Sequence, residues 1–288
     1  MRFGVVGTGF WAREAHGNGI KASTGGELVG VWGRDPARTS EAAESLGVTR
    51  YDDFDAMLAD VDAVSFAVPP DVQASLATRA AQAGKHLLLE KPLATTVEAA
   101  DALVQTVRDA GVASVVFVTA AYTSERREWA QRMNANGTWR GANLMFLGAI
   151  EGSPFETPWR QDKGGLWDVG PHAIAALSDA LGPIEQVVSA GRGERDVVHV
   201  VFGHAGGATS TATLTLTAPK AAALVELVAW GDAGIERMPQ GGPPIASILA
   251  AAADELIASA TSGQPHPLDV AYGARVVGLL AAAEALLG

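Results

Sequence analysis

The chain has 288 residues, of which 48% are hydrophobic, enough for one large domain or two ordinary ones. Its 21 basic and 32 acidic residues give a net charge of −11, which argues against a nucleic-acid or anionic-membrane partner. The absence of cysteine excludes disulfides, thiolate metal sites and cysteine nucleophiles. The first apolar run begins almost at Met1, so we expect no signal peptide and a soluble cytoplasmic protein.

The first part of the chain alternates short apolar runs with helical segments. We expect strands at Arg2–Val6, Glu27–Trp32, Asp62–Val68, Leu87–Leu89 and Ser114–Thr119. Helices are expected between them at Pro36–Leu46, Asp53–Leu58, Asp71–Ala83 and Thr96–Ala110. This alternation predicts an α/β domain over residues 1–120, with a doubly wound parallel sheet covered by helices on both faces.

The pattern changes after Tyr122. Strand-like runs follow at Ala142–Ile150, Ile184–Ala190, Val197–Phe202, Thr209–Thr217 and Leu224–Trp230. Helices are expected at Glu125–Met133, Trp167–Leu181, Ile245–Ala260 and Leu268–Leu287. Strands joined by short turns predict an open, mostly antiparallel sheet. We therefore expect residues 121–288 to form an α+β domain for substrate binding and oligomerisation.

One face of the run Thr209–Thr217 consists only of threonine. The alternate residues on the other face are Ser210, Ala212, Leu214 and Leu216. A polar face without charge differs from a typical exposed surface, so we predict a homodimer or homotetramer formed through this sheet. A solvated face is the alternative, because threonine suits exposed strands.

A glycine-rich turn follows the first expected strand, with the sequence Gly7-Thr8-Gly9-Phe10-Trp11-Ala12. In a dinucleotide fingerprint the first glycine permits the tight turn, the second lets the pyrophosphate approach the backbone, and a small third residue lets helix and strand pack closely. The helix that follows directs its N-terminus toward the phosphates. The motif lies at the start of a βαβ unit, the context that supports it.

The second expected strand ends at Trp32, where dinucleotide-binding domains usually carry an acidic residue for the ribose of NAD. This chain has Arg34 there, and Arg38 one helical turn later. Arginine suits the 2′-phosphate of NADP through charge-assisted hydrogen bonds, so the pattern favours NADP over NAD. Asp35 is the opposing observation, because it could reach the ribose itself, and a solvated Arg34–Asp35 corner is a further alternative.

The segment Gly84–Pro92 reads GKHLLLEKP. Gly84 ends a helix, Leu87–Leu89 predict a strand buried on both faces, and Glu90 and Lys91 follow at the carboxyl end of that strand. Open α/β sheets bind their ligands at this edge, where a lysine can reach a substrate oxygen. Seen alone, the pair could equally be solvated charges on a loop.

Asp168 and His172 are spaced i, i+4 and would share one face of the expected helix. Glycines precede them at positions 164 and 165 and permit close approach of a ligand to the backbone. A histidine beside a carboxylate is a candidate proton donor or acceptor. The alternatives are a helix cap for Asp168 and a packed core position for His172.

Together these motifs resemble the Gfo/Idh/MocA family of nicotinamide-dependent oxidoreductases, the group of glucose–fructose oxidoreductase and inositol dehydrogenase. The resemblance extends over nearly the whole chain, at Gly7–Ala12, Tyr51–Phe54, Asp62–Val64, Ala67–Asp71, Ala83–Leu93, Gly137–Gly141, Trp159–Arg160 and Gly164–His172. Its most specific part is the run Ala83–Leu93. The resemblance implies a Rossmann domain followed by the α+β domain.

The resemblance also implies roles for individual residues. Lys91 would contact the reacting hydroxyl or carbonyl, His172 would act as acid or base, Asp168 would hold the substrate or His172, and a cis bond would join Lys91 to Pro92. Trp159 and Arg160 are candidates for the substrate pocket wall. The cofactor-binding set would comprise Gly7, Thr8, Gly9, Phe10, Trp11, Ala12, Arg34, Arg38, Val68, Pro69, Glu90, Lys91 and Pro92, with no metal site.

We therefore expect reversible hydride transfer between NADP, or else NAD, and a secondary alcohol or carbonyl of a sugar, cyclitol or related small polyol. Three departures bear on the substrate: the family commonly has histidine where this chain has Gln73, many members carry Asp where this chain has Ala175, and the chain looks shorter than most members, mainly in the second domain. A non-enzymatic dinucleotide-sensing regulator is the rival class, although such relatives typically lose the lysine or the histidine. A reductase of an unsaturated or imine substrate is a third possibility.

Overall fold

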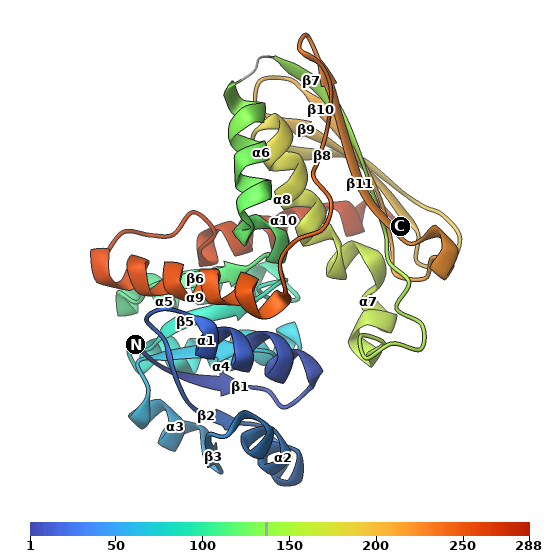
Figure 1. Ribbon diagram of the computed structural model, residues 1–288. Coiled ribbons are helices and arrows are strands. Elements are labelled where there is room, and N and C mark those ends of the chain that lie inside the picture. Colours follow the sequence, from blue (N-terminus) through green and yellow to red (C-terminus); the bar gives the residue numbers. More distant parts are fainter. Residues whose placement is uncertain (136–137) are drawn as a thin grey trace. The chain divides into compact units, whose positions relative to one another are not determined.

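The computed structural model describes residues 1–135 and 138–288, and it divides into two compact units (Figure 1). The first unit comprises Met1–Tyr122 and Pro243–Val277, and the second comprises Thr123–Gly242 and Gly278–Gly288. Gly137, one of the residues that carry the family resemblance, lies outside the described residues.

The first unit contains a six-stranded parallel sheet with the order β3-β2-β1-β4-β5-β6. Its strands are β1 (Arg2–Val6), β2 (Glu27–Trp32), β3 (Thr49–Tyr51), β4 (Ala63–Phe66), β5 (His86–Glu90) and β6 (Ser114–Phe117). Every residue of β4 and β6 is buried. Continuous apolar runs in the sequence correspond to strands covered on both faces, as predicted.

Helices connect these strands. They are the π-helix η1 (Ala12–Gly17), α1 (Asn18–Ala22), α2 (Pro36–Leu46), α3 (Phe54–Asp60), α4 (Pro70–Gln82) and α5 (Val97–Ala110), followed by the short 3₁₀ helix η2 (Thr119–Tyr122). Local signals define their ends: the side chains of Asp35, Asp53 and Thr96 cap the starts of α2, α3 and α5. Gly47 and Gly111 end α2 and α5 in the left-handed conformation.

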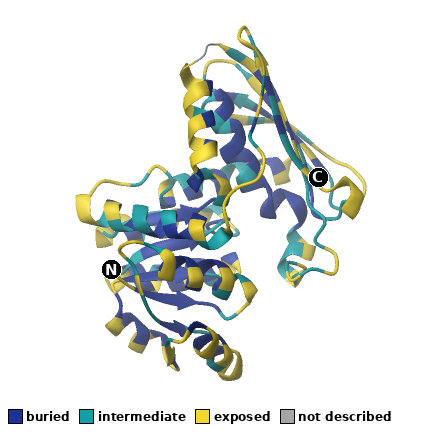
Figure 2. Ribbon diagram, viewed as in Figure 1, coloured by how far each residue is buried: buried dark blue, intermediate teal, exposed yellow. Residues whose placement is uncertain are grey.

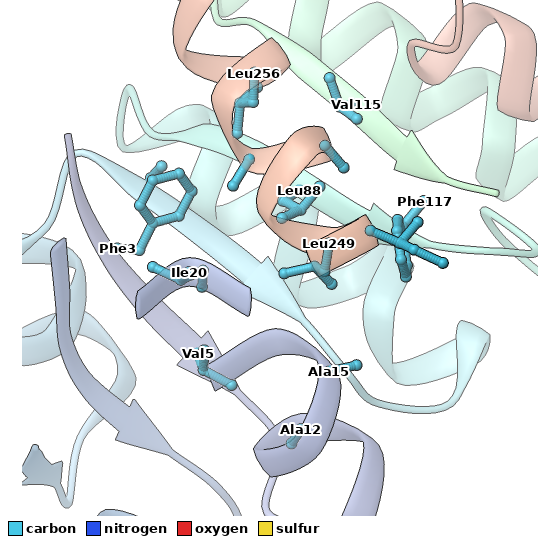
Figure 3. Packing of buried hydrophobic residues seen from close by; sticks show 14 of the residues in the cluster. Phe3, Val5, Ala12, Ala15, Ile20, Leu88, Val115, Phe117, Leu249 and Leu256 are labelled. Carbon is cyan, nitrogen blue, oxygen red and sulfur yellow. The ribbon is translucent and has the colours of Figure 1, made fainter. Parts of the chain in front are cut away.

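Helix α9 (Ile245–Ser262) belongs to the first unit, although it follows the second sheet in the sequence. Figure 3 shows Leu249 and Leu256 of α9 beside Ile20, Leu88 and Val115 of the Rossmann core. The helix has the length and hydropathy of a membrane span, but its apolar face fills this core. From the sequence we expect all of residues 121–288 to form the second domain. In the structure, residues 243–277 belong to the first unit instead. Apolar, alanine-rich helices suit either core, and only tertiary packing selects between them.

The second unit contains a mixed six-stranded sheet with the order β12-β11-β7-β10-β9-β8. Its strands are β7 (Trp139–Leu147), β8 (Ile184–Arg192), β9 (Val198–His204), β10 (Thr209–Thr215), β11 (Leu224–Gly231) and β12 (Gly234–Arg237). β7 runs parallel to β10 and antiparallel to β11, and the remaining neighbours are antiparallel. The predicted open, mostly antiparallel sheet is confirmed.

The helices of the second unit are α6 (Ser124–Ala135), α7 (Pro158–Asp168) and α8 (Gly170–Leu181), with the short 3₁₀ helix η3 (Lys220–Ala222) and the last part of α10 (Val270–Ala285). The most buried of them, α8, contacts β7, β8, β10 and β11. Figure 2 shows dark, buried helical segments beside a sheet that also carries exposed residues. In β10, Ser210, Ala212 and Leu214 are buried, whereas Thr209 and Thr211 are exposed, which matches the predicted alternation. At the end of the strand the alternation stops, because Thr215 is also buried and donates a hydrogen bond to Asp196.

The expected single helix over Trp167–Leu181 is wrong. The structure has two helices that meet at Val169, and Gly164 adopts a non-helical conformation with φ 63° within α7. Pro171 explains the interruption, because it has no N–H to donate to the carbonyl of Trp167. Asp168 therefore ends α7, and His172 lies in the first turn of α8.

Candidate functional site

The glycine turn after β1 has the geometry that a dinucleotide requires. Gly7 has φ +130°, and a Cβ atom there would lie 2.5 Å from the carbonyl oxygen of Ala67, so only glycine fits. A Cβ atom at Gly9 would meet no atom within 4 Å, which leaves the backbone open to a ligand. Ala12 is buried at the start of η1, as the close packing of a small residue predicts. The turn therefore fits the pyrophosphate of a dinucleotide.

The tip of β2 carries two arginines and an aspartate in different surroundings. Arg34 and Arg38 are both exposed. The carboxylate of Asp35 accepts hydrogen bonds from the backbone amides of Ala37 (2.9 Å) and Arg38 (3.2 Å) and thereby caps α2. Because Oδ1 of Asp35 accepts these bonds, it faces the N-terminus of α2 rather than a ribose. The guanidinium groups of Arg34 and Arg38 remain accessible.

The carboxyl ends of β4 and β5 supply the remaining predicted cofactor residues of the first unit. Val68 and Pro69 follow β4, and Glu90 is the last residue of β5. The bond between Lys91 and Pro92 is cis, which confirms the expectation from the resemblance. Because β2, β1, β4 and β5 are consecutive neighbours in a parallel sheet, the loops that follow these strands lie along one edge. The strand order reverses between β1 and β4, which is the topological switch point where such sheets bind their ligands.

Glu90 is held by a buried network that includes a histidine which the sequence reasoning missed. Its Oε1 atom accepts a hydrogen bond from the indole nitrogen of Trp11 at 2.6 Å and lies 3.2 Å from Nε2 of His16. His16 is fully buried, and its Nδ1 lies 2.7 Å from the hydroxyl of Ser65. Since an ionised carboxylate can only accept, Nε2 of His16 donates to Glu90, and the hydroxyl of Ser65 pairs with the other ring nitrogen.

This network connects the dinucleotide turn to the Glu90–Lys91 corner. Trp11 and His16 come from the turn and the π-helix, whereas Glu90 ends β5. π-helical turns are rare and frequently occur at functional sites. The burial of His16, its contacts and its place in a π-helix depend on the folded structure, and a single sequence reveals none of them.

The second unit carries the remaining candidates. Nε of Arg160 donates to Oδ2 of Asp168 at 3.0 Å, and Asp168 is 6% exposed. His172 is partly exposed, with its ring 5.9 Å from that of Phe146. Trp159 is partly buried and precedes Arg160 in the first turn of α7. Asp168 caps neither helix with its side chain, and its carboxylate with the Arg160 guanidinium forms an ion pair beside the α7–α8 junction.

Asp196 fixes the backbone before this junction. Its carboxylate accepts hydrogen bonds from the amides of Gly165 (3.1 Å) and Leu216 (2.7 Å) and from the hydroxyls of Thr215 and Thr217. Burial raises the pKa of Asp196, but these hydrogen bonds together outweigh it, so that the pKa lies below its ordinary value. A saturated, ionised carboxylate of this kind anchors α7 to the end of β10.

A cavity of about 460 Å³ opens in the second unit near the same loop, lined by Ala149, Glu151, Gly152, Arg195, Thr217, Ala218, Pro219 and Lys220. None of the predicted site residues lines it. Within residues 1–135 and 138–288, no three His, Asp or Glu side chains gather so that they could hold a metal ion.

Comparison with known proteins assigns residues 1–118 to a family. The model of an oxidoreductase family with an NAD-binding Rossmann fold, Gfo/Idh/MocA, matches residues 1–118. The Rossmann domain belongs to the Gfo/Idh/MocA family. The expected resemblance is confirmed, and the family comprises NAD(P)-dependent oxidoreductases, among them sugar dehydrogenases.

Two curated relatives illustrate the match. UDP-N-acetylglucosamine 3-dehydrogenase of Acidithiobacillus ferrooxidans is 39% identical over 104 residues, which are 36% of this chain and 32% of that protein. D-xylose 1-dehydrogenase (NADP(+)) 2 of Haloferax volcanii is 36% identical over 115 residues, 39% of this chain and 35% of that protein. The matched segments thus span about a third of the length of these curated relatives.

Solved structures extend the likeness to the second unit at the level of the fold. Levoglucosan dehydrogenase, solved in complex with NADH and levoglucosan, superposes with a TM-score of 0.87 at 19% sequence identity and covers 99% of this chain and 96% of that one. The expected fold class, a Rossmann domain with a mostly antiparallel α+β domain, is confirmed. Other solved structures with this fold were determined with NAD or with NADP.

Proposed function

We propose that this chain is an NAD(P)-dependent oxidoreductase that interconverts a secondary alcohol and a carbonyl group of a sugar, cyclitol or related small polyol. The observation that carries the proposal is Lys91, which directly follows β5 on the same sheet edge as the glycine turn after β1. The bound nicotinamide supplies the hydride chemistry. The relatives support a sugar substrate, since they include a nucleotide-sugar dehydrogenase and a xylose dehydrogenase.

The protein groups would orient the substrate and handle its proton. Lys91 donates a hydrogen bond to the reacting oxygen and polarises it, while His172 takes the hydroxyl proton during oxidation and returns it during reduction. Asp168 orients His172 or a substrate hydroxyl, and its ion pair with Arg160 holds it in place. Trp159 and Arg160 form part of the pocket wall.

A substrate panel tests this proposal. Purified protein is mixed with polyols, aldoses, ketoses and nucleotide sugars, and the nicotinamide absorbance is followed with NAD(H) and with NADP(H). With the best substrate, Lys91→Ala and His172→Ala should each lower kcat by roughly 10²–10⁴-fold, the usual contribution of general acid–base catalysis. The double variant is measured as well, because a loss smaller than the two single losses combined is the signature of two groups that serve one proton transfer.

The rival regulator predicts a different result. A dinucleotide sensor would bind the cofactor without turning over any member of the panel, and that outcome would contradict the enzyme proposal. Cofactor Kd and melting temperature are the controls for both variants. If melting falls sharply while turnover per folded molecule survives, Lys91 and His172 are structural residues.

We propose NADP(H) as the preferred cofactor, with NAD(H) bound more weakly. Arg34 and Arg38 are exposed at the tip of β2, while Asp35 caps α2. A lost charge-assisted hydrogen bond costs about 1.5–3 kcal/mol, so Arg34→Ala should weaken NADPH by about one to two decades and leave NADH nearly unchanged. Fluorescence titration of both cofactors measures this, and equal losses would overturn the preference.

We also propose that the protein is a cytoplasmic homodimer or homotetramer in which a second copy covers the open face of the mixed sheet. Met145, Trp230 and Ile235 are exposed there at 36%, 47% and 66%, and they share that face with the threonines of β10 through the strand register. An isologous interface needs a self-complementary patch of this kind. Light scattering should give at least the dimer mass for the wild type and a smaller mass for Ile235→Lys. A wild-type monomer at micromolar concentration would contradict the proposal.

A further inference from the structure

We propose that Gln73 is a positioning residue that fixes the backbone on both sides of Lys91. The inference rests on the proposed function, because Lys91 is the group that it would position. Gln73 lies in the first turn of α4 and is fully buried. It therefore reaches neither solvent nor ligand directly, and its effect on chemistry has to pass through other residues.

The side-chain amide of Gln73 uses both of its polar atoms on the Glu90–Leu93 corner. Its Oε1 accepts a hydrogen bond from the backbone amide of Glu90 at 2.8 Å, and its Nε2 donates to the carbonyl of Glu90, also at 2.8 Å. Nε2 also lies 3.2 Å from the carbonyl of Leu93 and 3.4 Å from that of Pro92. One side chain thus contacts the peptide groups that precede and follow Lys91.

Few other residue types could make this set of contacts. The site presents one N–H donor and three carbonyl acceptors inside the protein, so the occupant needs an acceptor and a two-proton donor at the end of a flexible side chain. A hydrophobic side chain would leave these groups unsatisfied, and a carboxylate would oppose the carbonyl oxygens. A neutral amide therefore matches the corner.

A second set of contacts fixes the side chain of Glu90. Trp11 and His16 bind its Oε1, and the backbone amide of Lys91 donates to its Oε2 at 3.1 Å. Glu90 is thereby held at its amide, its carbonyl and its carboxylate. The backbone of Lys91 consequently has little freedom, while its side chain extends from a fixed point.

This arrangement predicts an effect on turnover rather than on cofactor binding. A misplacement of about 1 Å can cost about 10²-fold in rate when it disturbs a reacting group. The side-chain partners of Gln73 are backbone groups of Glu90, Pro92 and Leu93, whereas the glycine turn and Arg34 would bind the cofactor phosphates. A variant that releases the corner should therefore lower kcat and leave the cofactor Kd nearly unchanged.

The test compares Gln73→Met with Gln82→Met. Gln82 ends the same helix α4 and is exposed, so it controls for helix propensity and for the substitution itself. Gln73→Glu is the second variant, because it keeps the acceptor for the Glu90 amide but loses the donor to the carbonyls. We expect kcat to fall by about 10–100-fold in both Gln73 variants, with KM and cofactor Kd within about threefold of wild type, and no change in Gln82→Met.

Amide hydrogen exchange provides a readout that does not depend on turnover. Exchange at Glu90 should become about tenfold faster or more in Gln73→Met, because its amide loses the acceptor Oε1 of Gln73. Exchange at Lys91 should rise with it, because its amide donates to the carboxylate of Glu90, which the released backbone no longer holds in place. Exchange at Leu88 in the middle of β5 should not change. Unchanged exchange at the corner would overturn the proposal. So would a lower melting temperature with unchanged kcat per folded molecule.

The failure of the proposed function would be recognised separately. If the wild type turns over no substrate of the panel, the enzyme proposal fails, and the exchange measurement alone decides whether Gln73 holds Lys91. Faster exchange at Glu90 and Lys91 would then still support the positioning role, and unchanged exchange would overturn it.

Discussion

The two sheets of this protein have the same number of strands but differ in how far their faces are buried. Helices cover both faces of the parallel sheet, and successive residues such as Leu87 and Leu88 in β5 are both fully buried. In the mixed sheet, burial alternates along β10: Leu214 is fully buried, whereas Thr211 is exposed. The first sheet can therefore offer ligands only its edge, while the second also presents a face.

This difference explains where the candidate residues lie. In the parallel sheet, the loops after β1, β2, β4 and β5 share one edge, so residues distant in sequence lie along it. In the mixed sheet, strands run in both directions, and the candidate side chains Asp168 and His172 come from helices instead. A parallel sheet thus gathers loops by topology, whereas the second unit depends on a helix junction.

The largest effects on the free energy of unfolding should come from truncating single buried side chains of the strands to alanine. Leu87→Ala and Leu88→Ala should each cost about 2–5 kcal/mol of unfolding free energy, because both side chains fill a core. In β10, Leu214→Ala should cost as much, whereas its neighbour Thr213→Ala should cost less than about 1 kcal/mol. Urea unfolding of the four variants measures these values. A small loss at Leu87 or Leu88, or a large loss at Thr213, would break the contrast between the sheets.

The edge of the parallel sheet can be tested with two glycines. Gly7→Ala should destabilise the protein by about 1–3 kcal/mol, because alanine is strained at φ +130° and its Cβ would contact the carbonyl of Ala67. Gly9→Ala should leave unfolding unchanged, since its Cβ points into open space, but it should weaken dinucleotide binding. Thermal melting and cofactor titration separate the two effects. Intact cofactor affinity in Gly9→Ala would argue against a ligand at this turn.

A smaller, pH-dependent effect should belong to the mixed sheet. His204 is 3% exposed, with Nδ1 at 2.7 Å from the carbonyl of Gly182 and Nε2 at 2.8 Å from the hydroxyl of Ser210. Burial lowers the pKa of His204, although the hydrogen bond to Gly182 opposes this. The histidine therefore favours folding above its unfolded pKa of about 6.5, and this contribution is lost as the pH falls through the lower folded pKa.

Melting temperature measured from pH 8 to pH 5 should fall less steeply in His204→Asn than in the wild type. The difference should be no more than about 2–4 °C, the shift that about 1 kcal/mol produces in a protein of this size. His199→Asn is the matched control, because His199 lies in the same strand β9 but is exposed, and its ring contacts the hydroxyl of Thr213. Identical slopes for wild type and His204→Asn would show that His204 does not titrate in this range.

The sequence by itself determined the local structures and the type of each sheet. Continuous apolar runs predicted the buried parallel strands, alternation predicted the two faces of β10, and the glycine spacing predicted the dinucleotide turn. Local motifs also located Lys91 at the end of β5 and Arg34 at the tip of β2. These features depend on neighbouring residues, backbone conformation and the periodicity of side chains, all of which a single sequence contains.

Tertiary structure alone decided the contacts between distant segments. His16 pairs with Glu90, which lies 74 positions later in the sequence. Gln73 binds the backbone of Glu90, which lies 17 positions later. The return of α9 to the first core and the parallel pairing of β7 with β10 are of the same kind. Hydrophobic patterning specifies that a face is buried but not which partner buries it, and a buried polar side chain has no periodic signal.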